Sequence, residues 1–165
     1  LDSGRWSQSQ RVAQDDWQIA GCPVNGPSVA SSNKTIGVAW YTEAKGFGEI
    51  KFALSNEDTV QFKSPIIIDQ GTHVMGQIGL AADNDRGFLV SWVTSDGGDS
   101  GGLNLRYIDH QGGLGPTNRV TDVDLLHQVG LPQLALEGNV AVMAWTGGDK
   151  NMTRVHVKTL DLSGS

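Results

Sequence analysis

The chain has 165 residues and a net charge of −6, with 12 Lys and Arg residues against 18 Asp and Glu residues. Because the basic residues are scattered along an acidic chain, the composition argues against a surface that binds nucleic acid. The longest apolar stretch, near 87–93, is far shorter than the roughly 20 residues that cross a bilayer, so we expect no membrane partner.

Turn-forming residues dominate the chain: it contains 22 Gly, and Pro, Asn, Asp and Ser recur in clusters. No segment has the pattern of a long amphipathic helix. This composition predicts an all-β fold made of many short strands joined by turns, in a single domain. Cys22 is the only cysteine, so no disulfide can form within the chain and cysteine usage does not indicate a compartment.

Residues 1–20 resemble the end of a later unit. The opening "LDSG" is similar to "LDLSG" near the C-terminus, and Arg11-Val12 resembles Arg119-Val120. We therefore expect 1–20 to supply an outer strand that closes the last unit of a repeat.

Three segments then follow one pattern: an apolar strand, a polar turn, and a second apolar strand that ends at a Trp. The segments cover 25–42, 76–94 and 130–148, and Trp40, Trp92 and Trp145 are 52 and 53 residues apart. This period is close to the length of a four-stranded propeller blade. A repeated apolar Trp predicts packing between blades.

Third strands are expected at 48–55, 103–109 and 155–164, and outer strands at 62–69 and 115–123. The predicted units are residues 21–71, 72–124 and 125–165, of which the last lacks an outer strand. Three blades are fewer than the four to eight of a closed ring. Either the chain is half of a longer six-bladed protein, or two copies form a homodimer in which each N-terminal strand completes the partner's last blade.

The stretches "GCPVNGPSVA", "VAWYTEA", "ALSNEDTVQFKSPIIID" and "GQIGLAADNDRGFLVSW" resemble bacterial sialidase-like proteins of the BNR or Asp-box class, which are six-bladed propellers. The resemblance covers most of the chain but about half of such a protein. The turn from Ser55 to Phe62 stands where an Asp-box lies and keeps only its first and last residues. The resemblance implies a secreted or periplasmic protein.

Sialidases hold the substrate carboxylate with three Arg residues and cleave with a Tyr, a Glu and an Asp. The resemblance makes Tyr41 and Glu43 the candidates for catalytic residues, but the Arg-Ile-Pro motif that carries the first Arg is missing. The leading prediction is therefore a ligand-binding module, for a carbohydrate by preference, without evident catalytic residues. The alternatives are a fragment of an exo-sialidase whose Arg triad lies in other blades, and a structural or protein-interaction ring.

Propellers bind ligands on the loops that lead into the first strand of each blade and on the loops that join second to third strands. Aligning the repeats on these loops predicts a set of ligand-binding candidates: Trp17, Cys22, Asn25, Tyr41, Glu43, His73, Gln77, Asp96, His127, Gln133 and Asp149.

Cys22, His73 and His127 occupy equivalent positions in the three repeats. Cys and His side chains are ligands for zinc or copper, so these residues are candidates for a metal site in the channel. The alternative is a small buried Cys and two His that hydrogen-bond within loops. The sequence predicts no cofactor.

Overall fold

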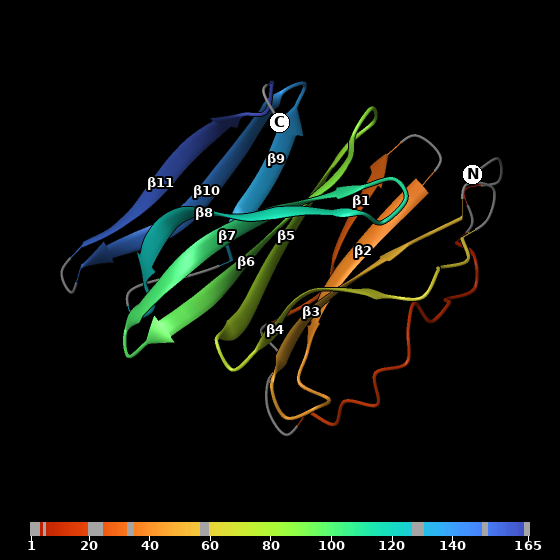
Figure 1. Ribbon diagram of the computed structural model, residues 1–165, viewed down its shortest axis with the longest axis horizontal. Coiled ribbons are helices and arrows are strands. Elements are labelled where there is room, and N and C mark those ends of the chain that lie inside the picture. The colour runs from red at the N-terminus through yellow and green to blue at the C-terminus, as the bar shows by residue number, and fades with distance from the viewer. Residues whose placement is uncertain are drawn as a thin grey trace.

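A computed structural model describes residues 4, 6–19, 25–32, 35–56, 60–126, 131–149 and 152–163. The described residues form strands and turns and contain no helix, which confirms the all-β prediction. Accordingly, no described helix is long and apolar enough to cross a bilayer. The described residues contain eleven strands (Figure 1): β1 (Ser28–Ser32), β2 (Thr35–Thr42), β3 (Gly48–Leu54), β4 (Ile66–Gly71), β5 (Val74–Asp83), β6 (Gly87–Gly97), β7 (Ser100–Asp109), β8 (Leu114–Asp124), β9 (Gln133–Glu137), β10 (Val140–Asp149) and β11 (Met152–Asp161).

These strands make three antiparallel sheets in which neighbours in sequence are neighbours in space. The first sheet has the order β1-β2-β3-β4, the second β5-β6-β7-β8, and the third β9-β10-β11. The three sheets correspond to the three repeat segments, and the described part of the third sheet has three strands. Short turns join the strands because Asn, Asp and Gly lie between the apolar runs.

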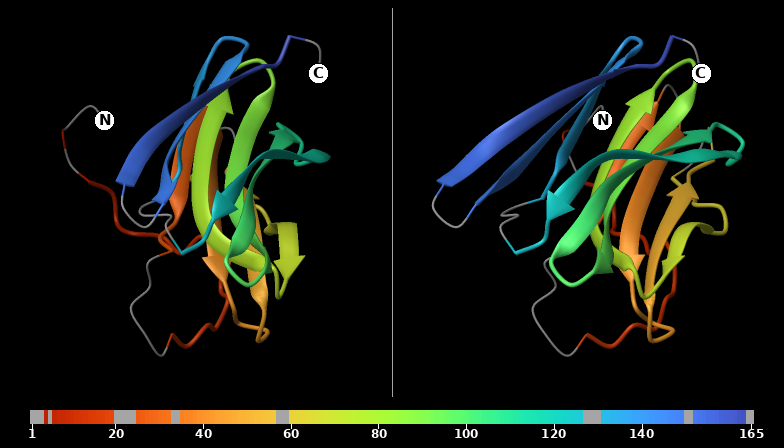
Figure 2. Two further views of the ribbon diagram at one scale, coloured as in Figure 1. Left: turned by 90° about the vertical axis from the view of Figure 1, so that its left-hand side faces the viewer. Right: turned by 60° about the vertical axis from the view of Figure 1, so that its left-hand side comes forward.

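The sheets are stacked face to face, and their first strands converge (Figures 1 and 2). β5 packs against both β1 and β9, so the second sheet lies between the other two. One core, between the first and second sheets, contains the fully buried Phe52, Phe88 and Trp92. A second core, between the second and third sheets, contains Leu103 and Met143.

Gly37 permits the closest approach in the first core. A Cβ atom at this position would lie 2.6 Å from the Phe88 ring and 2.7 Å from the Phe52 ring. These distances are too short for van der Waals contact, so any larger residue would push the two rings apart.

The repeated Trp residues occupy equivalent positions and face the same way in the stack. Trp92 points toward the first sheet and donates from its indole Nε1 to Asp69 of β4 across 2.8 Å. Trp40 points away from the second sheet and donates to Asp15 of the N-terminal segment. Trp145 points toward the second sheet and stacks on His156, with ring centroids 5.6 Å apart.

The N-terminal segment, described over 6–19, forms no strand within one chain. It runs along the outward face of the first sheet, where Lys51 of β3 contacts Asp15 across 2.5 Å. Figures 1 and 2 place this segment on the side of the molecule opposite β11. Within one chain, it therefore does not pair with the edge of the third sheet.

The turn that resembles an Asp-box is closed by its two retained residues. Ser55 and Phe62 form an isolated β-bridge, and the buried Ser55 hydroxyl accepts a hydrogen bond from the Ile36 amide at 2.8 Å. Residues 57–59 lie outside the described part of the chain. The turn therefore has a structural role in anchoring β3 to β2.

Trp92→Ala should destabilise the fold strongly, because it removes a side chain that is 0 % exposed and leaves Asp69 without its indole partner. We expect a loss of about 3 to 5 kcal/mol in the free energy of unfolding, measured by urea denaturation. Trp6→Ala is the matched control, since Trp6 is 97 % exposed. Equal stability of both variants would contradict the packing described above.

Candidate functional site

The first strands of all three sheets meet at a small pocket. Its volume is about 240 Å³, and ten residues line it: Gly26, Pro27, Ser28, Ile78, Gly79, Leu80, Leu131, Pro132, Gln133 and Leu134. These residues belong to β1, β5 and β9 or directly precede β1 and β9. None of them carries a charged side chain, so the pocket offers backbone groups, one hydroxyl and one amide to a ligand.

Two of the predicted ligand-binding residues, Asn25 and Gln77, are joined by a hydrogen bond beside the wall of this pocket. The Asn25 amide donates to the Met75 carbonyl at 3.1 Å, and its Oδ1 accepts from the Gln77 backbone amide at 2.8 Å. Gln77 has a φ of 54° at an irregularity in the pairing of β5 with β6. This left-handed backbone is unusual for a residue with a side chain, and the Asn25 contact helps to stabilise it.

Gln133 lines the pocket, and a buried hydroxyl lies behind Gly79 of its wall. Gln133 is exposed at the start of β9, and its amide donates to the Leu131 carbonyl at 3.1 Å. Behind Gly79, the buried hydroxyl of Ser91 makes no hydrogen bond within the described residues. Gln133 is therefore the predicted residue best placed to reach a ligand in the pocket.

Tyr41 and Glu43 are in contact, but the prediction that Tyr41 lies on a loop is wrong. Tyr41 is within β2, is 8 % exposed, and its hydroxyl donates to the Glu43 carboxylate. Trp17 meets the Tyr41 ring edge-on at 5.8 Å. Burial, followed by the hydrogen bond and negative charge of Glu43, raises the pKa of Tyr41 well above its ordinary range. The phenol therefore keeps its proton at neutral pH.

The predicted metal trio is only partly described. His73 lies in the turn between β4 and β5, with its Nε2 atom 3.3 Å from Asp69 Oδ1. Cys22 and His127 lie outside the described residues. Within the described ranges, no three His, Cys, Asp or Glu side chains are grouped as a metal site.

Asp96 is engaged by Arg119 of β8. The guanidinium donates to both carboxylate oxygens, at 3.0 and 2.5 Å, and these bonds hold the pKa of Asp96 below its usual range. Asp122 accepts from the same guanidinium at 2.8 Å. Asp96 therefore anchors the outer strand β8.

Asp149 is the last residue of β10, and its side chain lies outside the described part of the chain.

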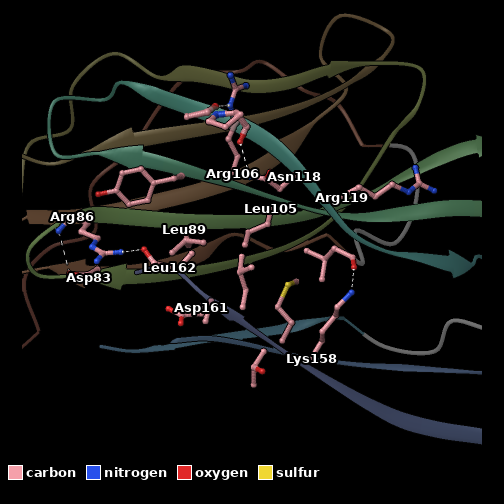
Figure 3. Close-up of a pocket in the computed structure, with 18 residues that line it drawn as sticks. Asp83, Arg86, Leu89, Leu105, Arg106, Asn118, Arg119, Lys158, Asp161 and Leu162 are labelled. Atoms are coloured by element: carbon pink, nitrogen blue, oxygen red, sulfur yellow. Dashed lines mark hydrogen bonds between the residues drawn. The ribbon is translucent and has the colours of Figure 1, made fainter. Parts of the chain in front are cut away.

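A larger cleft that the sequence did not predict lies between the second and third sheets (Figure 3). Its volume is about 810 Å³, and apolar side chains from β6, β7, β8, β10 and β11 form much of its lining. Four cations contribute to it: Arg86, Arg106, Arg119 and Lys158. Each already donates to the protein at 2.5 to 3.0 Å, for example Arg86 to the Leu162 carbonyl and Lys158 to the Val120 carbonyl.

The two cavities differ in how they are built. Arg119 is paired with Asp96, whereas Arg86, Arg106 and Lys158 donate to neutral protein oxygens along the walls of the larger cleft. The larger cleft lies between two sheets, whereas the smaller pocket is formed by the first strands of all three sheets, and we take the smaller pocket as the candidate ligand site.

No protein-family model matches this chain, and no curated protein sequence matches it.

Tyr41 and Tyr107, the chain's two tyrosines, should both ionise above pH 10. Tyr107→Phe isolates Tyr41, whose phenolate absorbance should then rise only well beyond pH 10. Because the folded pKa is raised, the associated stability is complete below pH 10 and is lost as the pH rises through the folded pKa. A normal titration near pH 10 in the folded variant would contradict the burial of Tyr41 against Glu43.

Proposed function

We propose that this chain is a sialidase-like β-propeller module, half of a six-bladed ring, that binds a small uncharged ligand at the convergence of β1, β5 and β9. The pocket built jointly by these three strands carries the proposal. Three consecutive antiparallel sheets with converging first strands are what neighbouring propeller blades require (Figure 1).

A neutral sugar is the ligand class that fits the pocket. At about 240 Å³ it is smaller than the roughly 300 to 1,000 Å³ of sites for drug-sized molecules. Its groups are uncharged donors and acceptors, including Gln133 and Ser28. Such groups can pair with sugar hydroxyls, whereas a sialic acid carboxylate would need a cation that this lining does not provide.

A hydrolytic role receives less support. The Tyr41 side chain is 8 % exposed within β2, and no arginine lines the small pocket. We therefore propose binding without turnover.

Binding of immobilised neutral glycans, followed by titration of any glycan that binds, tests this proposal. Gln133→Ala should weaken binding roughly two- to tenfold, the effect of losing a neutral hydrogen bond. Gln70→Ala is the matched control, because Gln70 is an exposed amide on β4 that does not line the pocket. Absence of glycan binding, or equal weakening by both variants, would overturn the assignment. Turnover of a fluorogenic sialoside would favour the hydrolase instead.

A further inference from the structure

The outer edge of the third sheet pairs with no other described strand. β11 is ten residues long, every one of them exposed, and it pairs with β10 alone among the described strands. Its equivalents β3 and β7 are each covered by a fourth strand, β4 and β8. An edge of this length presents a row of free backbone donors and acceptors to another strand.

The large cleft opens beside this edge. Residues 158–162, at the end of β11, form one wall of the cleft, and β8 contributes to the opposite wall (Figure 3). A strand added to β11 would extend the third sheet over the mouth of this cleft. The added strand would cover the apolar floor of the cleft, around Leu105, Met143 and Leu160, and would shield it from water as the first core is shielded.

The N-terminal segment already lies where a fourth strand of a neighbouring sheet would lie. Trp40 and Trp92 are equivalent, because they pair with Lys51 and Asn104 at the same point of their sheets. The indole of Trp92 binds Asp69, which belongs to the fourth strand of the sheet packed against it. The indole of Trp40 binds Asp15 in the same way, so Asp15 takes the place of a fourth-strand aspartate.

The sheet to which this strand would belong must pack on the outward face of the first sheet. Among the described strands the third sheet has no fourth member, and its outward face exposes Val155 and Val157 by 73 % and 63 %. The third sheet of the same chain lies on the far side of the second sheet (Figure 2). A second copy of the chain can supply its own third sheet at this face.

We propose that two copies assemble head to tail by strand exchange, with residues 12–17 of each chain pairing antiparallel with β11 of the other. The third sheet of one copy then covers Trp40 and the first sheet of its partner. The same contact repeats across a two-fold axis, so both open faces are buried and no sheet edge of this kind remains. This inference rests on packing and is independent of ligand binding.

The pairing of β3 with β4 in the first sheet predicts the register in which residues 12–17 pair with β11 of the partner chain. Trp40 pairs with Lys51 and Trp145 with His156, so the preceding residues Ile50 and Val155 are equivalent. Ile50 pairs with Asp69, and Asp15 takes the place of Asp69, so Asp15 should lie opposite Val155. Phe52, which is equivalent to Val157, pairs with Ile66, three residues before Asp69. Val12, three residues before Asp15, should therefore lie opposite Val157.

Cross-linking between separately purified chains tests this register. Val12→Cys in one chain and Val157→Cys in the other, both with Cys22→Ser, are mixed under native conditions and oxidised. Directly opposed residues have Cβ atoms about 4.5 to 5.5 Å apart, near enough for a disulfide or a short thiol cross-linker. We expect a covalent species of twice the 17.6 kDa chain mass.

Val12→Cys mixed with Met152→Cys is the matched control. Met152 is also exposed on β11 but lies five residues from Val157, so it should cross-link far less. Equal yields from the two pairs, or no covalent dimer from either, would overturn the proposal.

Light scattering on a sizing column provides the second measurement. The unmodified chain should have twice the chain mass, and Asp15→Ala should weaken the dimer by roughly tenfold, because Trp40 and Lys51 of the same chain then no longer hold residues 12–17 in place for pairing with β11 of the partner. Gln18→Ala is the control, since Gln18 is exposed and lies outside residues 12–17. A folded monomer at high concentration would show instead that the open faces await further blades of a longer chain.

Discussion

The structure depends on one constraint: the second sheet is apolar on both faces, so it must be covered on both sides. The second sheet satisfies this condition completely. Val90 and Trp92 face the first sheet, Leu89 and Val93 face the third, and all four are at most 2 % exposed. A single sheet of this kind would lose most of its stabilising burial in water, which is why the stack is the stable unit.

The outer sheets meet the constraint less completely. On the first sheet, the N-terminal segment covers part of the outward face, and Lys51 binds both Asp15 and the buried Glu49 there, at 2.5 and 3.6 Å. On the third sheet, the outward valines remain exposed. The two ends of the stack are therefore complementary. The first sheet is covered by an N-terminal segment that pairs with no described sheet, and the described part of the third sheet has no fourth strand.

The same stacking creates the candidate ligand site. The residues that form the small pocket come from three places about fifty residues apart in the sequence and meet because the first strands converge. The larger cleft has a different origin, since it lies between sheets beside the unpaired edge and its cations are already bonded to protein oxygens.

Several features of the site could be predicted, and others could not. The repeat alignment selected Asn25, Gln77 and Gln133, which lie in or beside the pocket, because equivalent loops of a repeat occupy equivalent places. The pairing of Asp96 with Arg119 was missed, because the two residues are 23 positions apart and meet only through the bulged pairing of β7 with β8. Tyr41 was placed on a loop although β2 continues to Thr42.

By itself, the sequence determined the all-β fold class, because the alternation of apolar residues and the turn residues are local signals. Its three repeat segments, marked by the Trp period, fall in the three sheets. Only the tertiary structure decided which charged groups are neutralised within the fold, where the first strands form a pocket, and on which face the N-terminal segment lies. Those outcomes depend on how the sheets pack and on the register of their strands, and contacts between residues far apart in the chain leave no pattern in a single sequence.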